Sequence, residues 1–379
     1  MKRIAIVLAA MLVTAAVPVG AVTAQQSSAE SSAYAGTHVS FDASENAVTN
    51  YTVDGETVLQ SVSTSSQANA GIGLDIALSA VTDIDASALS LGTTTETSAT
   101  VQADSGATLN AHDNPKGTLV IAAGDESQYV TANLSGESKA EQVDDSRVVV
   151  ENDNRTGTFI VVGDGEVTVN EEGNVSADLA EDSRLVFRSY DGERTAEDER
   201  SEELIANGSA AAEVYVMQEN GSTVADTVTY DEQTTVETTS DAKDNVTMTI
   251  DRSVHEGTIV MTTVSEEALA ATDNLSVTVD GEAAVEAESY SELQSAANGG
   301  DNSAYLVQET SADAESNVYV AVNHFSEREV SMTNDDSSTT DSTTADDETT
   351  SSSTNAPGFG IGVSVVALAG AALFARRRA

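Results

Sequence analysis

Alternation of apolar and polar residues with a period of two runs through most of this chain, and it restricts the fold more than any other feature. The segments 47–53 (AVTNYTV) and 56–62 (ETVLQSV) show it on either side of Asp54-Gly55. Successive side chains of a strand point to opposite faces of a sheet, so the pattern indicates strands with one buried face. Asp-Gly suits the positive φ angles of a type I′ turn, and we therefore expect a β-hairpin there.

Further strands are expected at Val- and Thr-rich segments separated by Gly, Asn or Asp: 117–123, 146–151, 157–162, 166–169, 212–217, 246–250, 257–263, 275–279, 304–308 and 317–324. Short helices are expected at 265–271, after the capping box Ser289-Tyr290-Ser291-Glu292, and at 193–206, where a loop is the alternative. We predict a mostly β fold, with antiparallel β-sandwich-like ectodomains and few short helices. A parallel β-solenoid is the lesser option.

The tripeptide Asp-Gly-Glu occurs four times, beginning at Asp54, Asp164, Asp191 and Asp280. The pentapeptides at 52–56 and 278–282 are identical (TVDGE). We interpret these as repeated hairpin turns; a duplicated module is the alternative, although no sustained period of 20 to 50 residues accompanies them.

Acidic residues far outnumber basic ones. Of 16 basic residues, five lie in the two terminal hydrophobic regions, which leaves 11 against 63 acidic residues and a net charge of about −52 between them. In molar salt the Debye length falls to about 3 Å, so such a chain can compact there despite its self-repulsion. We interpret it as a protein of an extreme halophile. A disordered acidic chain and a calcium-storing chain are the alternatives. Over most of the chain, the 40% apolar content in strand-like alternation argues against disorder. The acid excess also argues against nucleic acid as a partner.

The N-terminal region has the pattern of a signal peptide. Lys2 and Arg3 precede the uncharged apolar run 4–22, and Val22-Thr23-Ala24 places small residues where a signal peptidase reads them. We expect export by the general secretory route and cleavage after Ala24. An uncleaved N-terminal anchor is the alternative. No cysteine occurs, so the exported part must hold together without disulfides.

At the C-terminal end, a segment rich in Ser, Thr and Asp (333–355) precedes Pro357-Gly358-Phe359, an uncharged segment at 359–375 and Arg376-Arg377-Arg378. We expect a disordered, solvated stalk at 333–355, because it contains almost nothing to bury. As a helix, the 17 residues 359–375 would span roughly 25 Å, near the lower limit for crossing a bilayer. The three arginines would place its end in the cytoplasm.

This arrangement resembles the PGF-CTERM sorting signal of archaeal surface proteins. The resemblance rests on Pro357, Gly358 and Phe359 and on the basic end Arg376 to Arg378, within 356–379. It implies that an archaeosortase removes the helix and joins the new end to a membrane lipid. A plain transmembrane anchor is the alternative. With either outcome the membrane is a partner, and signal peptidase and archaeosortase are the processing enzymes.

Domain boundaries are weakly marked. We expect a first β domain at 25–112, ending before Pro115, and a β-rich region at 113–332 that the acidic segment 191–212 divides in two. Eight Asn-x-Ser/Thr sequons are candidate N-glycosylation sites. They are Asn50, Asn133, Asn154, Asn174, Asn207, Asn220, Asn245 and Asn274.

Motifs for catalysis or metal binding are absent from the sequence. The four histidines, His38, His112, His255 and His324, occur in no metalloprotease pattern, and there is no Gly-x-Ser-x-Gly elbow or Walker loop. The segment 152–157 (NDNRTG) imitates the start of an EF-hand loop, but Gly163 stands where the bidentate Glu should be, so we interpret it as a hairpin turn. We expect no enzyme activity, no catalytic residue and no cofactor or metal site beyond non-specific cations.

Three classes of function remain. The first is a glycosylated, tethered envelope protein of a haloarchaeon with a structural role or with other envelope proteins as partners. The second is an adhesin or solute-binding lipoprotein, against which the lack of Trp counts for sugar stacking. The third is a secreted hydrolase. A cleft that joins a histidine to a carboxylate and a serine would favour the hydrolase.

Overall fold

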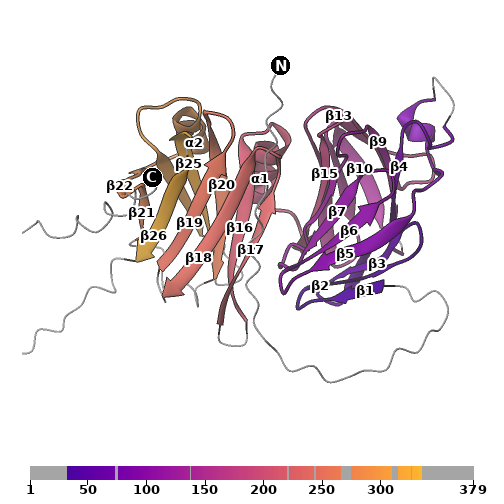
Figure 1. The fold of residues 1–379 in the computed structure, drawn as a ribbon, viewed down its shortest axis with the longest axis horizontal. Helices are drawn as coiled ribbons and strands as arrows, with labels where there is room; N and C mark the ends of the chain where they lie inside the picture. The colour runs from indigo at the N-terminus through magenta and orange to yellow at the C-terminus, as the bar shows by residue number, and fades with distance from the viewer. Residues whose placement is uncertain are drawn as a thin grey trace, which may run out of the picture. The chain divides into compact units, whose positions relative to one another are not determined.

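The computed structural model describes residues 32–72, 76–136, 138–219, 222–242, 245–265, 275–309, 315–325 and 327–334. All of these residues belong to one compact unit. Their fold is mostly β, as predicted, with two short α-helices and four sheets (Figure 1). A search of the described helices finds no segment of the length and hydrophobicity that a membrane crossing requires.

Sheets A and B form the first β-sandwich. In sheet order, sheet A contains β1 (Ser32–Ala35), β2 (Val39–Ala43), β3 (Val48–Val53), β4 (Glu56–Ser66), β9 (Gln128–Leu134), β14 (Val175–Leu179) and β13 (Gly165–Val169). Sheet B contains β10 (Lys139–Asp144), β11 (Arg147–Glu151), β12 (Arg155–Val162), β15 (Arg184–Asp191), β8 (Leu119–Ala122), β7 (Thr108–His112), β6 (Ser98–Ala103) and β5 (Leu89–Thr94).

Alternating residues of both sheets meet in the core of this first sandwich. Tyr51 and Leu59 from sheet A and Leu109, Phe159 and Phe187 from sheet B are buried in the same cluster. The Phe159 and Phe187 rings lie 4.9 Å apart between centroids. Aliphatic side chains supply most of the remaining core, which agrees with the low aromatic content of the sequence.

Sheets C and D form the second β-sandwich. Sheet C contains β17 (Ser222–Thr229), β16 (Ala210–Glu219), β20 (Glu256–Ser265), β25 (Glu315–His324), β24 (Ala304–Glu309) and β23 (Val285–Glu286). Sheet D contains β18 (Thr234–Ala242), β19 (Asn245–Arg252), β26 (Arg328–Asn334), β21 (Leu275–Val279) and β22 (Glu282–Ala283). Sheet C departs from the antiparallel expectation, because β16 pairs parallel with β20 and β23 parallel with β24.

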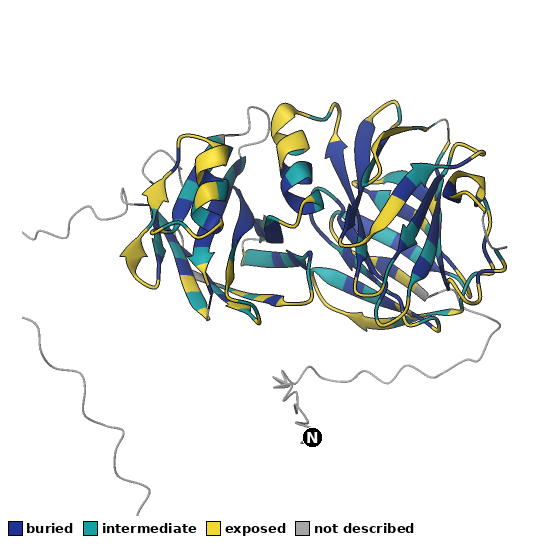
Figure 2. Cartoon of the chain, turned by 90° about the horizontal axis from the view of Figure 1, so that it is seen from above, coloured by how far each residue is buried: buried dark blue, intermediate teal, exposed yellow. Residues whose placement is uncertain are grey.

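The two helices cover the outer face of sheet C. Helix α1 (Ala196–Ala206) follows the first sandwich and α2 (Tyr290–Ala297) precedes β24. Their buried residues Leu204, Ile205 and Leu293 join an apolar cluster with Tyr215 and Tyr319 of sheet C. Exposed residues line the opposite helix faces (Figure 2).

The same cluster includes the outer face of sheet B and so joins the two sandwiches. Val120, Ile160 and Val186 of sheet B are buried in it together with residues of α1 and sheet C. Strand β12 is consequently buried at all eight positions, since both faces of sheet B are covered. We call this contact the junction.

Charged side chains cross the junction from both sides. The Arg188 guanidinium of β15 lies 3.1 Å from the Glu213 carboxylate of β16, and both side chains are buried. Tyr230 donates a hydrogen bond to the same carboxylate at 2.6 Å. Burial alone would lower the pKa of Arg188, but the charge of Glu213 raises it well above its usual value, so the guanidinium stays charged.

Helix α1 brings two further carboxylates to the junction. The buried Glu202 accepts hydrogen bonds from Thr158 and Tyr190, each at 2.8 Å. Asp198 lies 3.0 Å from the Lys116 ammonium. Burial raises the pKa of Asp198, but the charge of Lys116 and hydrogen bonds from Thr195 outweigh this, so its pKa lies below the usual value.

The turns agree with the sequence in two of four places. Asp54 and Gly55 have φ of 48° and 83° between β3 and β4, and Asp280 and Gly281 have 53° and 77° between β21 and β22. These are hairpins, as predicted. The other two predictions are wrong: Asp164-Gly165 leads from β12 in sheet B to β13 in sheet A, and Asp191-Gly192 leads into α1.

The chain does not divide at His112. Strand β7 ends there and pairs with β8, while β4 pairs with β9, so strands on both sides of residue 112 share the same two sheets. The 3₁₀ turn η1 (Leu78–Ala80) lies between β4 and β5, and Leu78 is buried there in a small cluster with Ala70, Val81 and Ile84. The two sandwiches meet instead within the segment 191–212, between β15 and β16.

Three smaller expectations need correction or lie outside the described residues. Strand β26 continues to Asn334, so the ectodomain includes residues 333 and 334, which we had expected in the stalk. Ser289 caps α2 by accepting from the backbone of Glu292, but the Glu292 carboxylate accepts from Glu288 instead of completing the box. A helix was expected at 265–271. Ser265 is instead the last residue of strand β20, and residues 266–271 lie outside the described part.

Candidate functional site

Several predicted site residues lie outside the described part of the chain. These are the cleavage residue Ala24, the sequons Asn220 and Asn274, and the sorting residues Pro357, Gly358, Phe359, Arg376, Arg377 and Arg378, together with the helix expected at 359–375. The structure therefore bears on the six other sequons, on the histidines and on the clefts of the ectodomain.

Three of the six described sequon asparagines are exposed. Asn50 lies in β3 with a φ of 53°, at a bulge where the pairing of β2 with β3 changes register. Asn154 lies in the turn between β11 and β12. Asn207 ends α1 as its C-cap residue. The exposure of all three leaves room for an attached group.

The other three are half-buried and hold neighbouring segments together. The Asn133 side chain in β9 donates to Ser61 on β4 at 3.0 Å. The side-chain oxygen of Asn174 accepts from the backbone nitrogen of Leu134, also at 3.0 Å. Asn245 accepts a hydrogen bond from Ser331 on β26 at 3.3 Å. Their amide side chains therefore have structural roles.

The four histidines do not form one group. His38 contacts Asp54 at 2.8 Å, and His112 contacts the buried Asp226 at the junction at 3.0 Å. His255 and His324 line one cleft, but their Nδ1 atoms contact the Phe325 backbone oxygen and the Asn323 side chain. Neither of those two contacts is the carboxylate partner that orients the histidine of a catalytic triad.

That cleft, the histidine cleft, lies where both helices end. It has a volume of about 550 Å³, and its lining includes Asn207, Ser209, Arg252, His255, Asn298 and His324. The Arg252 guanidinium already donates hydrogen bonds within the chain, to Asp231 at 3.0 Å, to Thr234 at 2.9 Å and to the Glu256 backbone oxygen at 2.9 Å. The cleft therefore offers polar groups with little unused positive charge.

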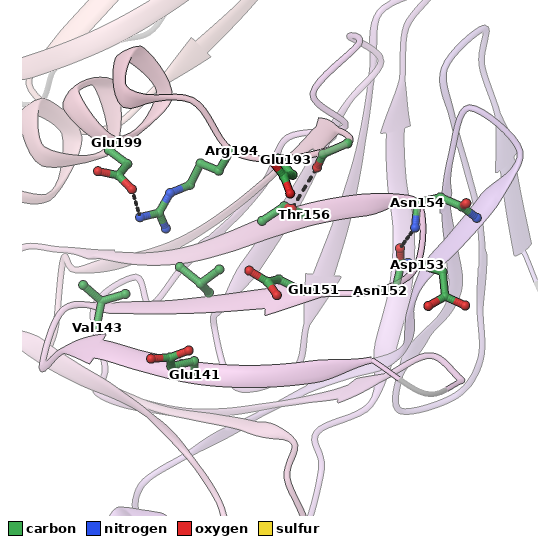
Figure 3. Close-up of a pocket in the computed structure, with 12 residues that line it drawn as sticks. Glu141, Val143, Glu151, Asn152, Asp153, Asn154, Thr156, Glu193, Arg194 and Glu199 are labelled. Carbon is green, nitrogen blue, oxygen red and sulfur yellow. Dashed lines mark hydrogen bonds and ion pairs between the residues drawn. The ribbon is translucent and has the colours of Figure 1, made fainter.

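A second cleft, the acidic cleft, lies beside the β11–β12 turn and has a volume of about 540 Å³. Figure 3 shows five acidic residues of its lining, namely Glu141 of β10, Glu151 of β11, Asp153 of the turn, Glu193 before α1 and Glu199 of α1, together with Arg194. Arg194 donates to Glu199 at 2.8 Å. Within the described residues, no three metal-ligating side chains are arranged to hold an ion.

The EF-hand-like segment in this cleft is a hairpin turn, as interpreted from the sequence. The Asn152 side-chain oxygen accepts from the backbone nitrogens of Asn154 and Arg155, at 2.9 and 2.7 Å. It thereby closes the turn between β11 and β12, so this oxygen is already occupied by the backbone.

The junction residues were not found from the sequence. Arg188 and Glu213 are 25 positions apart, and Lys116 and Asp198 are 82 apart. The one relevant feature of the sequence is the scarcity of basic residues, which makes each of them a candidate for an ion pair. Each arginine that the structure describes pairs with a carboxylate, and Lys116, Arg184 and Arg188 pair across the junction.

Comparison with curated proteins finds no match. Among solved structures, a mutant of a glycoside hydrolase family 81 enzyme from Clostridium thermocellum overlaps 79% of this chain and 34% of that enzyme, with 9% sequence identity and a TM-score of 0.33. The chain spans about a third of that enzyme's length, and so weak a similarity carries no argument about fold or activity.

Protein-family models give a match at the C-terminal end only. Residues 356–378 match the PGF-CTERM motif, and this range contains Pro357 to Phe359 and Arg376 to Arg378. The ectodomain is assigned to no family. The chain therefore carries a PGF-CTERM sorting signal, which implies processing by an archaeosortase and marks an exported, membrane-anchored protein of the cell surface.

Proposed function

We propose that the chain is a glycosylated, lipid-tethered envelope protein of a halophilic archaeon, with a structural or interaction role and no enzyme activity. The observation that carries the proposal is the union of a surface-sorting signal with two β-sandwiches joined through a buried core. An ectodomain joined in this way suits a building element or spacer of an envelope, because its two halves share one buried apolar cluster.

The charge distribution supports the halophilic part of the proposal. Eleven basic residues face 63 acidic ones between the terminal hydrophobic regions. The described arginines are already paired, so most carboxylates must be neutralised by cations from solution. This demand is met in concentrated salt, where the Debye length is only about 3 Å.

Mass spectrometry of the mature protein extracted from native membranes tests the proposal. We expect an N-terminus at Gln25, loss of the segment 359–375, a lipid on the new C-terminus and glycans on some sequons. Cross-linking on intact cells should join the ectodomain to itself or to other envelope proteins. An intact C-terminal helix, sequons without glycans and no cross-linked species would contradict the proposal.

The second candidate is an adhesin or a solute-binding lipoprotein, and the two clefts favour it. A secreted hydrolase has less support, because the contacts of His255 and His324 described above do not include a carboxylate. Equilibrium dialysis of the ectodomain against envelope sugars and peptides in molar salt would favour the second candidate if saturable binding occurs.

A further inference from the structure

Asn207 combines four properties that no other described sequon asparagine has together. It is exposed, it ends a helix, its side-chain oxygen accepts from the backbone of Ser209 at 2.9 Å, and it lines the histidine cleft. Gly208, with a φ of 71°, turns the chain sharply between the asparagine and the sequon serine. Ser209 itself is partly exposed, so the whole sequon is presented at the surface.

The lining of the histidine cleft suits a neutral, hydroxyl-rich group. Gln294 and Asn298 contribute amides, His255 and His324 contribute imidazoles, and Glu256 also lines the cleft. The Asn323 amide is already bonded to Gly300, Ser303 and His324. Amides and imidazoles both donate and accept hydrogen bonds, as sugar hydroxyls require.

The electrostatics of the cleft oppose an anion. Asn207 and Asn298 are the C-caps of α1 and α2, and neither helix has a basic residue in its last turn. Helix C-termini carry partial negative charge and carbonyl acceptors, which attract hydroxyl donors. The one arginine of the lining is held by Asp231 and Thr234 and by the backbone near Glu256.

We propose that Asn207 is an N-glycosylation site and that the histidine cleft holds the first sugars of its glycan. The inference rests on the proposed function, because it requires an exported glycoprotein. It adds which sequon is modified and what occupies the cleft. Asn174 gives the internal contrast, because the serine of its sequon, Ser176, is fully buried and donates to the Val81 backbone oxygen at 2.5 Å.

The experiment maps glycopeptides of the full-length protein from native membranes. We expect most copies to carry a glycan at Asn207 and few or none at Asn174. The variants Asn207→Gln and Ser209→Ala should both lose this glycan. Ser209→Ala is the matched variant, because it keeps Asn207 and the backbone donor that contacts it.

Hydrogen exchange tests the place of the sugars. Backbone amides at 253–257 and 294–300 should exchange more slowly in the wild-type protein than in Ser209→Ala, while amides at 147–162 in the first sandwich should be unchanged. Equal exchange with Asn207 modified would overturn the assignment of the cleft.

The outcomes separate this inference from the proposed function. Glycans on other sequons with Asn207 bare would overturn the inference and leave the glycoprotein proposal standing. A complete absence of glycans from all sequons would overturn both.

Discussion

The junction and the acidic cleft differ in whether their carboxylates are buried with partners from the chain or exposed to solvent. At the junction, Glu213 and Glu202 are buried and each is held by hydrogen bonds from named partners. The acidic cleft, by contrast, is lined by five exposed acidic residues and one arginine. The chain has few basic residues and places three of them, Lys116, Arg184 and Arg188, in ion pairs across the junction.

This contrast has a physical reason in concentrated salt. Mobile ions screen exposed charges over a few ångströms but screen buried pairs much less. Exposed carboxylates can therefore rely on solution cations, whereas a carboxylate inside the junction needs a partner from the chain itself. The comparison leads to four predictions, from the largest expected effect to the smallest.

Removal of salt should have the largest effect. On transfer from molar to dilute salt, the ectodomain should unfold, because repulsion among its carboxylates is no longer screened. Circular dichroism during a salt titration would measure this. Replacing Glu141, Glu151 and Asp153 by their amides should shift the midpoint to lower salt. A melting temperature that stays constant from molar to dilute salt would refute the halophilic interpretation.

Arg188→Ala should destabilise the ectodomain by about 3–5 kcal/mol, because it leaves the buried Glu213 carboxylate without its cation. Denaturant unfolding in molar salt would measure the loss in the free energy of unfolding. The double variant Arg188→Met/Glu213→Leu should be much closer to wild type, since it removes both charges. Equal losses in the single and double variants would show that packing, not charge pairing, explains the effect.

Acid should weaken the Lys116–Asp198 contact. The pKa of Asp198 is lower in the folded protein than its unfolded value of about 3.9. The stabilisation is therefore present above about pH 4 and is lost as the pH falls through the lower, folded pKa. In Asp198→Asn, the stability between pH 4 and 2 should fall less steeply, and stability at neutral pH should drop by about 1.5–3 kcal/mol. In Lys116→Met, stability should also fall less steeply between pH 4 and 2. If the slope is unchanged in both variants, the Lys116–Asp198 contact does not cause the acid dependence.

Arg200→Ala should have the smallest effect, within about 0–1 kcal/mol. Arg200 pairs with Glu203 one turn along the exposed side of α1, where both side chains are roughly half exposed. The same unfolding assay applies, and the loss should shrink further as salt rises. A loss as large as that of Arg188→Ala would remove the distinction between the two regions.

Local geometry explains which parts of the fold could be predicted. The Asp54-Gly55 and Asp280-Gly281 hairpins depend on two positive φ angles that Asp and Gly supply themselves. The same dipeptide at Asp164 did not form a hairpin, because the following strand joins the opposite sheet. Strand pairing depends on residues far apart in the sequence, so a tripeptide does not determine which strand the next segment pairs with.

The candidate sites divide in the same way. The C-terminal signal could be identified from contiguous residues, and the family match bears it out. The sequons could be listed, but their ranking required knowledge of burial: Asn133 and Asn207 have equivalent motifs, yet one lies inside a sheet and the other ends a helix. The junction could not be predicted, because its partners are far apart in the sequence and are brought together only by the tertiary fold.

The position of the last strand has a mechanical consequence. Strand β26, after which the chain continues toward its membrane signal, lies in the interior of sheet D, paired with β19 on one side and β21 on the other. A pull on the tether therefore loads two antiparallel ladders at once, where an edge strand would load one. Force from a moving envelope should be shared by the second sandwich before any strand detaches.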